Sequence, residues 1–327
     1  MPSKVLITVS PIYRRAVWRL IDGLQQDGLE VRYLDRPDEQ LGATELGELL
    51  VDAEIYVVGN APVPRSVMEA APGLKLIAKF GVGVDNIDLT AAAELGIQVT
   101  NAPGANATAV AEMTLGVMLA LLRRLSQIER SLREWGWRAI AGQELYGKTL
   151  GIIGLGNIGQ QVATRARAFG MRVIANDIVE YPDFCRQHDV HPAGLDQTLA
   201  HSDVITLHVP LTPLTRRMIG PAELGRMKPG AVLIHTARGG VVDEAALHQA
   251  LKGGGLGGAA VDVFENEPLG WSPLRELDNI ILTPHIAGIT YEAAERIADR
   301  TLESVRAFRS YSKKPSRPPG PAPKRDL

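Results

Sequence analysis

Short apolar runs alternate with helix-period segments along the first hundred residues. The runs are four or five residues long, as strands of a parallel sheet are, and Gly28, Gly73 and Gly96 mark the ends of the intervening helices. Strands are expected at 5–9, 31–34, 54–58, 74–78 and 97–100, with helices near 13–26, 44–50, 67–70 and 89–95. Strands that alternate with helices predict a parallel sheet covered on both faces.

A second alternation follows a segment, residues 108–125, that is apolar nearly all round. Such a helix is typically buried, here between domains or subunits. Strands are then expected at 149–153, 172–176, 204–209, 231–235, 259–263 and 279–283. Six strands are the number of a complete doubly wound dinucleotide-binding domain.

One further helix-period segment, residues 291–308, would cross back and complete the first domain. The pattern therefore predicts two domains, one of residues 1–100 with 287–311 and the other of residues 101–286 inserted into it. A length of 327 residues also fits two domains. Residues 312–327 are rich in proline and basic side chains, which predicts a flexible tail.

Composition narrows the class of protein. Hydrophobic residues make up 45% and charged residues 22%, as in soluble globular proteins, and the longest apolar stretch is about half of what a bilayer needs. A net charge of −2 argues against nucleic-acid binding. The start of the chain resembles no signal segment, and one cysteine fits a reducing compartment. We expect a cytoplasmic protein that binds neither membrane nor nucleic acid.

Cys185, His188 and His191 superficially offer three metal ligands. Structural zinc sites usually have four ligands and more than one thiolate. We therefore expect a surface loop after a strand here, and no metal site.

A glycine-rich turn carries the first chemical signal. Gly154, Gly156 and Gly159, with Asn157 and Ile158 between them, lie between a predicted strand and a helix expected at 158–169. This context favours a dinucleotide site over an ordinary strand-to-helix turn, because the three glycines would serve the tight turn, the pyrophosphate approach and helix packing.

The next strand ends at Asp177. A carboxylate there would accept hydrogen bonds from the ribose hydroxyls and repel a 2′-phosphate, and no Arg or Lys follows it directly. The sequence therefore predicts NAD rather than NADP as the cofactor.

A bound nicotinamide makes hydride transfer the leading chemistry, which needs a proton carrier and a group that polarises a carbonyl. Arg238, Glu267 and His285 follow three consecutive predicted strands, at the edge where α/β proteins bind ligands. The planar fork of Arg238 suits a carboxylate, and a carboxylate near His285 would orient the ring and favour its imidazolium form. Each residue alone could be an ordinary loop or surface residue, but their shared placement favours a site.

The chain resembles the D-isomer-specific 2-hydroxyacid dehydrogenases, the group that includes phosphoglycerate dehydrogenases and glyoxylate or hydroxypyruvate reductases. The matching segments occur in one order at 81–88, 101–106, 110–112, 147–154, 208–212, 227–230, 238–239, 262–264, 267–268 and 284–285. The resemblance implies an α/β fold of two doubly wound parallel-sheet domains, a flavodoxin-like substrate domain and an inserted Rossmann NAD-binding domain. Members are usually dimers built around the long helix and a following arm, here 132–143, so a homodimer is expected.

The resemblance also implies roles for individual residues. His285 would be the general acid/base, Glu267 its partner, and Arg238 the group that holds the substrate carboxylate and polarises its C2 oxygen. Backbone N–H groups around Val82 and Gly83 would clasp the same carboxylate. The expected cofactor contacts are Thr108, Gly154, Gly156, Asn157, Ile158, Gly159, Asp177, Val209, Pro210, Ala237, Asp262, His285 and Gly288.

Some assignments stay open at this point. Asp262 would lie near the nicotinamide carboxamide by the same resemblance, although a buried structural carboxylate is an equally good account. The roles of Asn101 and Asn106 are undecided. Lys79 could meet a substrate phosphate or extend from a strand end to solvent.

The resemblance ranks glyoxylate, hydroxypyruvate and related 2-oxoacids first and 3-phosphoglycerate second, since residues 57–61 carry no basic side chain. The alternative is an NAD(H)-sensing binding protein, such as a corepressor that resembles this family.

Overall fold

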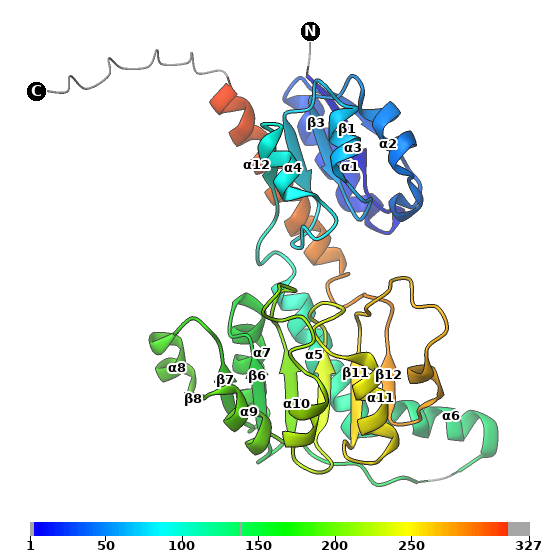
Figure 1. Cartoon of the computed structure of the whole chain (residues 1–327), viewed down its shortest axis with the longest axis vertical. Coiled ribbons are helices and arrows are strands. Elements are labelled where there is room, and N and C mark those ends of the chain that lie inside the picture. The colour runs from blue at the N-terminus through cyan, green and yellow to red at the C-terminus, as the bar shows by residue number, and fades with distance from the viewer. Residues whose placement is uncertain (1–2, 138, 313–327) are drawn as a thin grey trace, which may run out of the picture. The chain divides into compact units, whose positions relative to one another are not determined.

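The computed structural model describes residues 3–137 and 139–312. The chain divides into two compact units, one formed by residues up to Asn106 and from Thr290 onward, the other by Ala107–Ile289 (Figure 1). The sequence placed these boundaries at 100/101 and 286/287. Ala102 and Ala105 pack in the core of the first unit, and the backbone of Ile286 and Ala287 is bound by Asp262 in the second, which moves both boundaries.

The first unit is built on a five-stranded parallel sheet in the order β2-β1-β3-β4-β5. Its strands are β1 (Lys4–Thr8), β2 (Glu30–Tyr33), β3 (Ile55–Val58), β4 (Leu76–Lys79) and β5 (Gln98–Thr100). Its α-helices are α1 (Arg14–Gln26), α2 (Ala43–Leu50), α3 (Arg65–Glu69), α4 (Leu89–Glu94) and α12 (Tyr291–Ser312). Short 3-10 turns occupy Pro11–Tyr13 and Asp38–Gln40.

Alternate side chains of these strands enter two separate cores. Val5, Ile7 and Val57 pack with α1 and α12 on one face, while Leu6 and Tyr56 pack with α2, α3 and α4 on the other. The strand order is that of flavodoxin-like doubly wound sheets. Both observations confirm the predicted architecture of this unit.

The second unit has a seven-stranded parallel sheet in the order β12-β11-β10-β9-β6-β7-β8. Its strands are β6 (Thr149–Ile153), β7 (Arg172–Asn176), β8 (Val190–Pro192), β9 (Val204–Leu207), β10 (Val232–His235), β11 (Gly258–Val261) and β12 (Ile280–Leu282). Its α-helices are α5 (Ala107–Leu122), α6 (Leu125–Trp135), α7 (Asn157–Ala168), α8 (Pro182–His188), α9 (Leu195–His201), α10 (Pro221–Arg226) and α11 (Glu244–Lys252), with a 3-10 turn at Pro273–Glu276.

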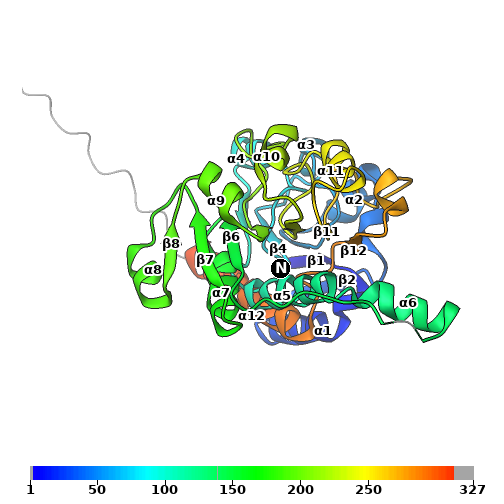
Figure 2. The same cartoon turned by 90° about the horizontal axis from the view of Figure 1, so that it is seen from below.

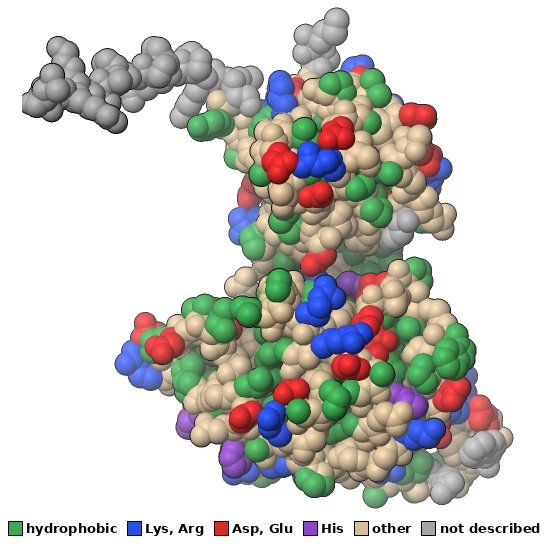
Figure 3. Space-filling model, in the orientation of Figure 1, with side chains coloured by type: hydrophobic (Ala, Val, Ile, Leu, Met, Phe, Trp, Pro, Cys, Tyr) green, Lys and Arg blue, Asp and Glu red, His purple; other side chains and the backbone are tan. Residues whose placement is uncertain are grey.

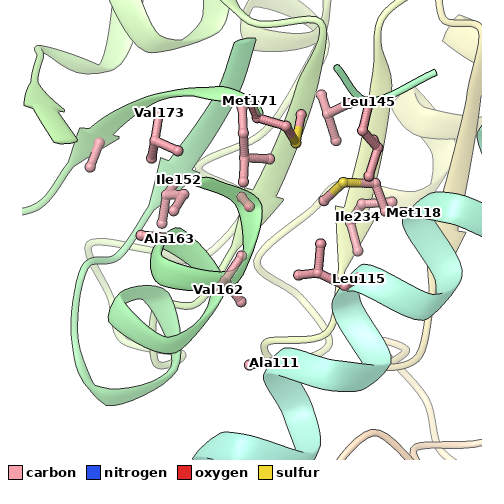
Figure 4. Packing of buried hydrophobic residues seen from close by; sticks show 14 of the residues in the cluster. Ala111, Leu115, Met118, Leu145, Ile152, Val162, Ala163, Met171, Val173 and Ile234 are labelled. Atoms are coloured by element: carbon pink, nitrogen blue, oxygen red, sulfur yellow. The ribbon is translucent and has the colours of Figure 1, made fainter. Parts of the chain in front are cut away.

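Helices cover both faces of this sheet, as Figure 2 shows. On one face α5 and α7 pack on β6, β7 and β10, and Figure 4 shows Leu115 and Met118 of α5 beside Ile234. On the other face α9, α10 and α11 cover Ile205 and Leu233. The strand order reverses between β6 and β9, so ligands are expected outside the carboxyl ends of these two strands.

Three predicted elements differ from the structure. Residues 185–191 form the end of α8 and the start of β8, not a surface loop, because Cys185 is buried in the core of the second unit. The segment 108–125 is not one helix, since Arg124 adopts a left-handed backbone (φ 54°) that ends α5 and begins α6. The predicted tail, 312–327, lies outside the described residues except for Ser312, the last residue of α12.

Neither a membrane-spanning helix nor a metal site is found in residues 3–137 and 139–312, the part of the chain that the structure describes. In that part of the chain no helix combines the length and apolarity needed to cross a membrane. In the same part, no three His, Cys, Asp or Glu side chains gather as a metal site would require. Figure 3 shows acidic and basic side chains interspersed on the visible face of each unit.

Candidate active site

The glycine loop joins β6 to α7 at the strand-order reversal. Gly154 has a φ of 97°, and a Cβ there would lie 2.7 Å from the main chain of His208. A Cβ at Gly159 would lie 2.1 Å from the carbonyl oxygen of Gly154. A Cβ at Gly156 would meet nothing within 4 Å, so this glycine borders open space at the helix N-terminus. That open space and the unpaired N–H groups of the first helical turn fit a pyrophosphate.

Asp177 follows β7 and is bound to this loop. Its Oδ2 accepts a hydrogen bond from the N–H of Leu155 at 2.5 Å, and its Oδ1 accepts one from the N–H of Val179 at 2.8 Å. The carboxylate is therefore fixed beside the glycine loop.

The other predicted cofactor contacts of this unit surround the same edge. Val209 and Pro210 follow β9, Ala237 follows β10, and Gly288 follows β12. Thr108 is the second residue of α5.

The predicted acid/base pair is formed. Nδ1 of His285 lies 2.7 Å from Oε2 of Glu267, and Oε1 of Glu267 accepts a hydrogen bond from the N–H of Phe264 at 2.9 Å. Burial would raise the pKa of Glu267, but the hydrogen bond and charge of His285, the N–H of Phe264 and the charge of Arg238 outweigh it. The pKa of Glu267 therefore lies below its ordinary value, which keeps this carboxylate ionised at neutral pH.

Asp262 holds the loop that carries His285. This carboxylate is only 2% exposed, and it accepts hydrogen bonds from the hydroxyl of Thr283 at 2.6 Å and from the N–H groups of Ile286 and Ala287, each at 2.9 Å. The carbonyl of Asp262 accepts the N–H of His285, whose backbone is left-handed (φ 54°). These contacts support the structural account of Asp262 and make it a positioning residue for His285.

Arg238 follows β10, the strand beside β11 in the sheet. Its Nη1 donates to the carbonyl of Ala237 at 2.8 Å, and its charge acts on Glu267. A Cβ at Gly239 would lie 1.8 Å from the carbonyl oxygen of Phe264, so the chain must have glycine where the two loops meet. Arg238, Glu267 and His285 thus follow the neighbouring strands β10, β11 and β12.

Val82 and Gly83 lie in the first unit, in the loop after β4, and both are partly exposed. The side-chain amide of Asn101 donates to the carbonyl of Val82 at 2.6 Å, which gives one of the undecided asparagines a structural partner. Asn106 is the last residue of the first segment of this unit.

Two histidines with lowered pKa values, the partly buried His208 and the buried His235, are not predicted from the sequence as titratable groups. Burial lowers the pKa of His208 to about 3 and that of His235 to about 4, so both rings are neutral at physiological pH. They lie at the carboxyl ends of β9 and β10, beside the predicted site, and Nε2 of His208 is 3.1 Å from the hydroxyl of Thr206. The apolar strands that precede them were the only signal of burial.

Comparisons with known proteins agree on one family. The model of the D-isomer specific 2-hydroxyacid dehydrogenase NAD binding domain matches residues 115–287. The chain is 45% identical over 294 residues to D-3-phosphoglycerate dehydrogenase of Methanocaldococcus jannaschii, which covers 87% of this chain and 56% of that protein. It is 43% identical over 278 residues to hydroxypyruvate reductase of Thermotoga maritima, which covers 83% of this chain and 90% of that protein.

Among solved structures, D-lactate dehydrogenase from Aquifex aeolicus, complexed with NAD and lactic acid, is similar with a TM-score of 0.82 and 34% identity. The match covers 94% of this chain and 96% of that one. This chain spans little more than half of the D-3-phosphoglycerate dehydrogenase from M. jannaschii, at 56% of its length.

Proposed function

The chain belongs to the D-isomer-specific 2-hydroxyacid dehydrogenase family, and on that premise we propose that it is an NAD-dependent oxidoreductase that interconverts a small 2-oxoacid and its D-2-hydroxyacid. The observation that carries the proposal is the His285–Glu267 pair at 2.7 Å, with Arg238 on the neighbouring strand end of an NAD-binding domain. A proton carrier, its carboxylate and a fixed cation are the groups that carbonyl reduction needs.

NAD, when bound, supplies or accepts the hydride at C2 of the substrate. The residues of the chain do the rest. The glycine loop and the N-terminus of α7 bind the pyrophosphate, and Asp177 accepts hydrogen bonds from the ribose hydroxyls. The guanidinium of Arg238 binds the substrate carboxylate and draws electron density from the C2 carbonyl.

His285 moves the proton. In reduction its Nε2, the ring nitrogen away from Glu267, donates a proton to the C2 oxygen as the hydride reaches C2; in oxidation the neutral ring takes that proton back. The charge of Glu267 stabilises the imidazolium, and Asp262 fixes the loop on which the ring stands. We infer that the N–H groups of Val82 and Gly83 bind the substrate carboxylate.

Glyoxylate and hydroxypyruvate are the first candidate substrates, and the oxoacid of 3-phosphoglycerate is the second. The relative of matching length, from T. maritima, is named a hydroxypyruvate reductase, which supports this order. We further propose a homodimer in the cytoplasm. The exposed apolar side chains of Leu125, Leu132 and Trp137, on and just after α6, would be covered by a second copy.

The test is the consumption of NADH, followed at 340 nm, with glyoxylate, hydroxypyruvate, pyruvate and 3-phosphohydroxypyruvate. We expect turnover of at least one of them, and its near abolition in His285→Gln with NADH affinity unchanged. Tight NADH binding without turnover of any 2-oxoacid would refute the proposed dehydrogenase activity and favour the alternative of an NAD(H)-sensing binding protein. The relatives named above are dehydrogenases or a reductase, and none supports the sensor.

A further inference from the structure

Lys79 is a buried cation at the end of β4, just before the loop that carries Val82 and Gly83. It is the last residue of β4, three residues before Val82, and is 6% exposed. An ammonium that leaves water must be compensated by polar groups, or its burial is costly. The partners of its three N–H donors therefore indicate its role.

Those partners are oxygen atoms of the first unit itself. Nζ of Lys79 donates to the carbonyl of Gly59, to Oδ1 of Asn86 at 3.1 Å and, at the limit of a hydrogen bond, to Oδ1 of Asn60 at 3.5 Å. Gly59 and Asn60 follow β3, whereas Asn86 lies beyond the Val82–Gly83 loop. These acceptors engage the ammonium within the first unit.

The short segment 59–61 is held from its other side as well. The amide of Asn86 donates to the carbonyls of Gly59 and Ala61, at 3.2 and 2.7 Å. The fully buried carboxylate of Asp38 accepts the N–H groups of Asn60 and Ala61. A buried cation and a buried anion thus act on the same short segment, 59–61.

These contacts bracket the loop that carries Val82 and Gly83. The loop begins at the backbone of Lys79, whose carbonyl accepts the N–H of Gly81 at 2.9 Å, and it ends at Asn86. Within the loop, the side-chain amide of Asn101 donates a hydrogen bond to the carbonyl of Val82 at 2.6 Å. Since both ends of the loop bind Gly59, removal of the Lys79 charge would release the loop and the segment 59–61 together.

Three arginines that follow other strands of this sheet are already paired with carboxylates. Arg14, Arg36 and Arg65, which follow β1, β2 and β3, each form an ion pair with a carboxylate, those of Asp35, Glu45 and Glu94. These pairs are exposed and each contributes little, so a phosphate could bind there only by displacing a carboxylate, whereas at Lys79 it would have to break the buried contacts.

We propose that Lys79 is a positioning residue that locks the Val82–Gly83 loop to the segment 59–61, and that the site therefore takes an unphosphorylated 2-oxoacid. The inference rests on the proposed function and names its substrate class. Lys79 acts on the substrate through the N–H groups of the loop and does not touch it.

The experiment compares hydroxypyruvate with 3-phosphohydroxypyruvate in the full chain and in Lys79→Met, which keeps the length of the side chain and removes its charge. We expect the unmodified chain to favour hydroxypyruvate by at least about tenfold in kcat/KM. In Lys79→Met, kcat/KM should fall by about tenfold or more for both substrates, their ratio should stay within about twofold, and NADH affinity should not change.

Lys75→Met is the matched control, because Lys75 is an exposed lysine just before the same strand, paired with Glu54. Lys75→Met should leave kcat/KM unchanged for both hydroxypyruvate and 3-phosphohydroxypyruvate. Asn86→Asp covers the case in which Lys79→Met does not fold, since it keeps Lys79 and the shape but loses both amide donations. It should lower kcat/KM for both substrates alike.

Preference of the unmodified chain for 3-phosphohydroxypyruvate, or a loss in Lys79→Met confined to that substrate, would overturn the inference and leave the proposed function intact. A parallel loss in Lys79→Met with unchanged preference supports it. If the unmodified chain reduces no 2-oxoacid at all, the proposed function fails and the inference fails with it.

Discussion

Acidification should destabilise the second unit through His235. This side chain is only 2% exposed. Burial lowers the pKa of His235 to about 4, and the main chain of Arg238 and the charge of Glu267 offset only part of that effect. In the unfolded chain the ring is exposed to water and returns to its ordinary value of 6.5.

The sign and size of the effect follow from these two values. Between pH 6.5 and 4 the unfolded chain binds a proton at this ring and the folded chain does not, so the free energy of unfolding falls as the pH falls. The stabilisation is complete above pH 6.5 and is lost as the pH approaches 4. At about 1.4 kcal/mol per pKa unit, the whole effect is about 3 kcal/mol, of which about 2 kcal/mol is lost between pH 7 and pH 5.

Urea unfolding at pH 7 and pH 5 measures this loss. A Trp18→Phe background leaves fluorescence to Trp135, Trp137 and Trp271, all of which lie in the second unit. In that background, His235→Gln should lose about 2 kcal/mol less stability between the two pH values than its parent.

His201→Gln is the control, because it makes the same substitution at an exposed side chain at the end of α9. It should lose as much stability as the parent. If His235→Gln also loses as much as the parent, proton uptake at His235 does not contribute, and the ring is either hydrated or partnered in the folded protein.

Four further predictions concern the proposed reaction. Asp177→Ala should narrow a preference for NADH over NADPH that we expect to be about a hundredfold in the unmodified chain, and equal use of both cofactors by the unmodified chain would contradict the role of Asp177. Arg238→Lys should lower kcat/KM for the 2-oxoacid by about a hundredfold with little change in NADH affinity, because it loses the bidentate fork; normal turnover would mean that another group holds the carboxylate. Glu267 is ionised at neutral pH, so Glu267→Gln should lower kcat/KM for the 2-oxoacid by about tenfold with NADH affinity unchanged, because the ring of His285 loses its charged partner; unchanged kcat/KM would exclude a role for Glu267. Asp262→Asn should lower kcat by about tenfold and spare NADH affinity, because one of the two oxygens that accept main-chain N–H groups of the His285 loop is replaced by an amide donor; unchanged kcat would refute the positioning role.

Hydrophobic periodicity predicted most of both sheets, because strands buried on two faces are continuous apolar runs of four or five residues. It missed β8, in which only Val190 is buried and the other two residues are exposed. It also missed the break after α5, because no glycine or proline occurs there and the left-handed Arg124 follows two turns of unbroken helix pattern. The chain direction at Arg124 depends on where α6 packs, which local pattern does not contain.

The residues of the candidate site likewise fall into those that the sequence predicts and those that it does not. Arg238, Glu267 and His285 were accessible to sequence reasoning because each follows a recognisable strand, and parallel strands end at one edge. Asp262 was left ambiguous, because its three hydrogen bonds go to residues more than twenty positions further along the chain. The degree to which His208 and His235 are covered depends on neighbouring strands and helices, so the sequence alone could equally have placed these histidines as exposed ligands.

This division has a physical basis that applies to both units. The groups proposed to meet the substrate are partly exposed, as the side-chain exposure of 47% for His285 shows, and a partly exposed group is not fixed by packing. Each is fixed instead by a neighbour that forms hydrogen bonds with its main chain. Asp262 accepts N–H groups of the His285 loop, and the side-chain amide of Asn101 donates to the carbonyl of Val82. A carboxylate suits the first task because it accepts several N–H groups at once, and an amide suits the second because it donates. Preorganisation of this kind costs nothing at the moment of reaction, since the polar groups are already oriented, and it explains why substitution of a residue that never touches the substrate should change kcat.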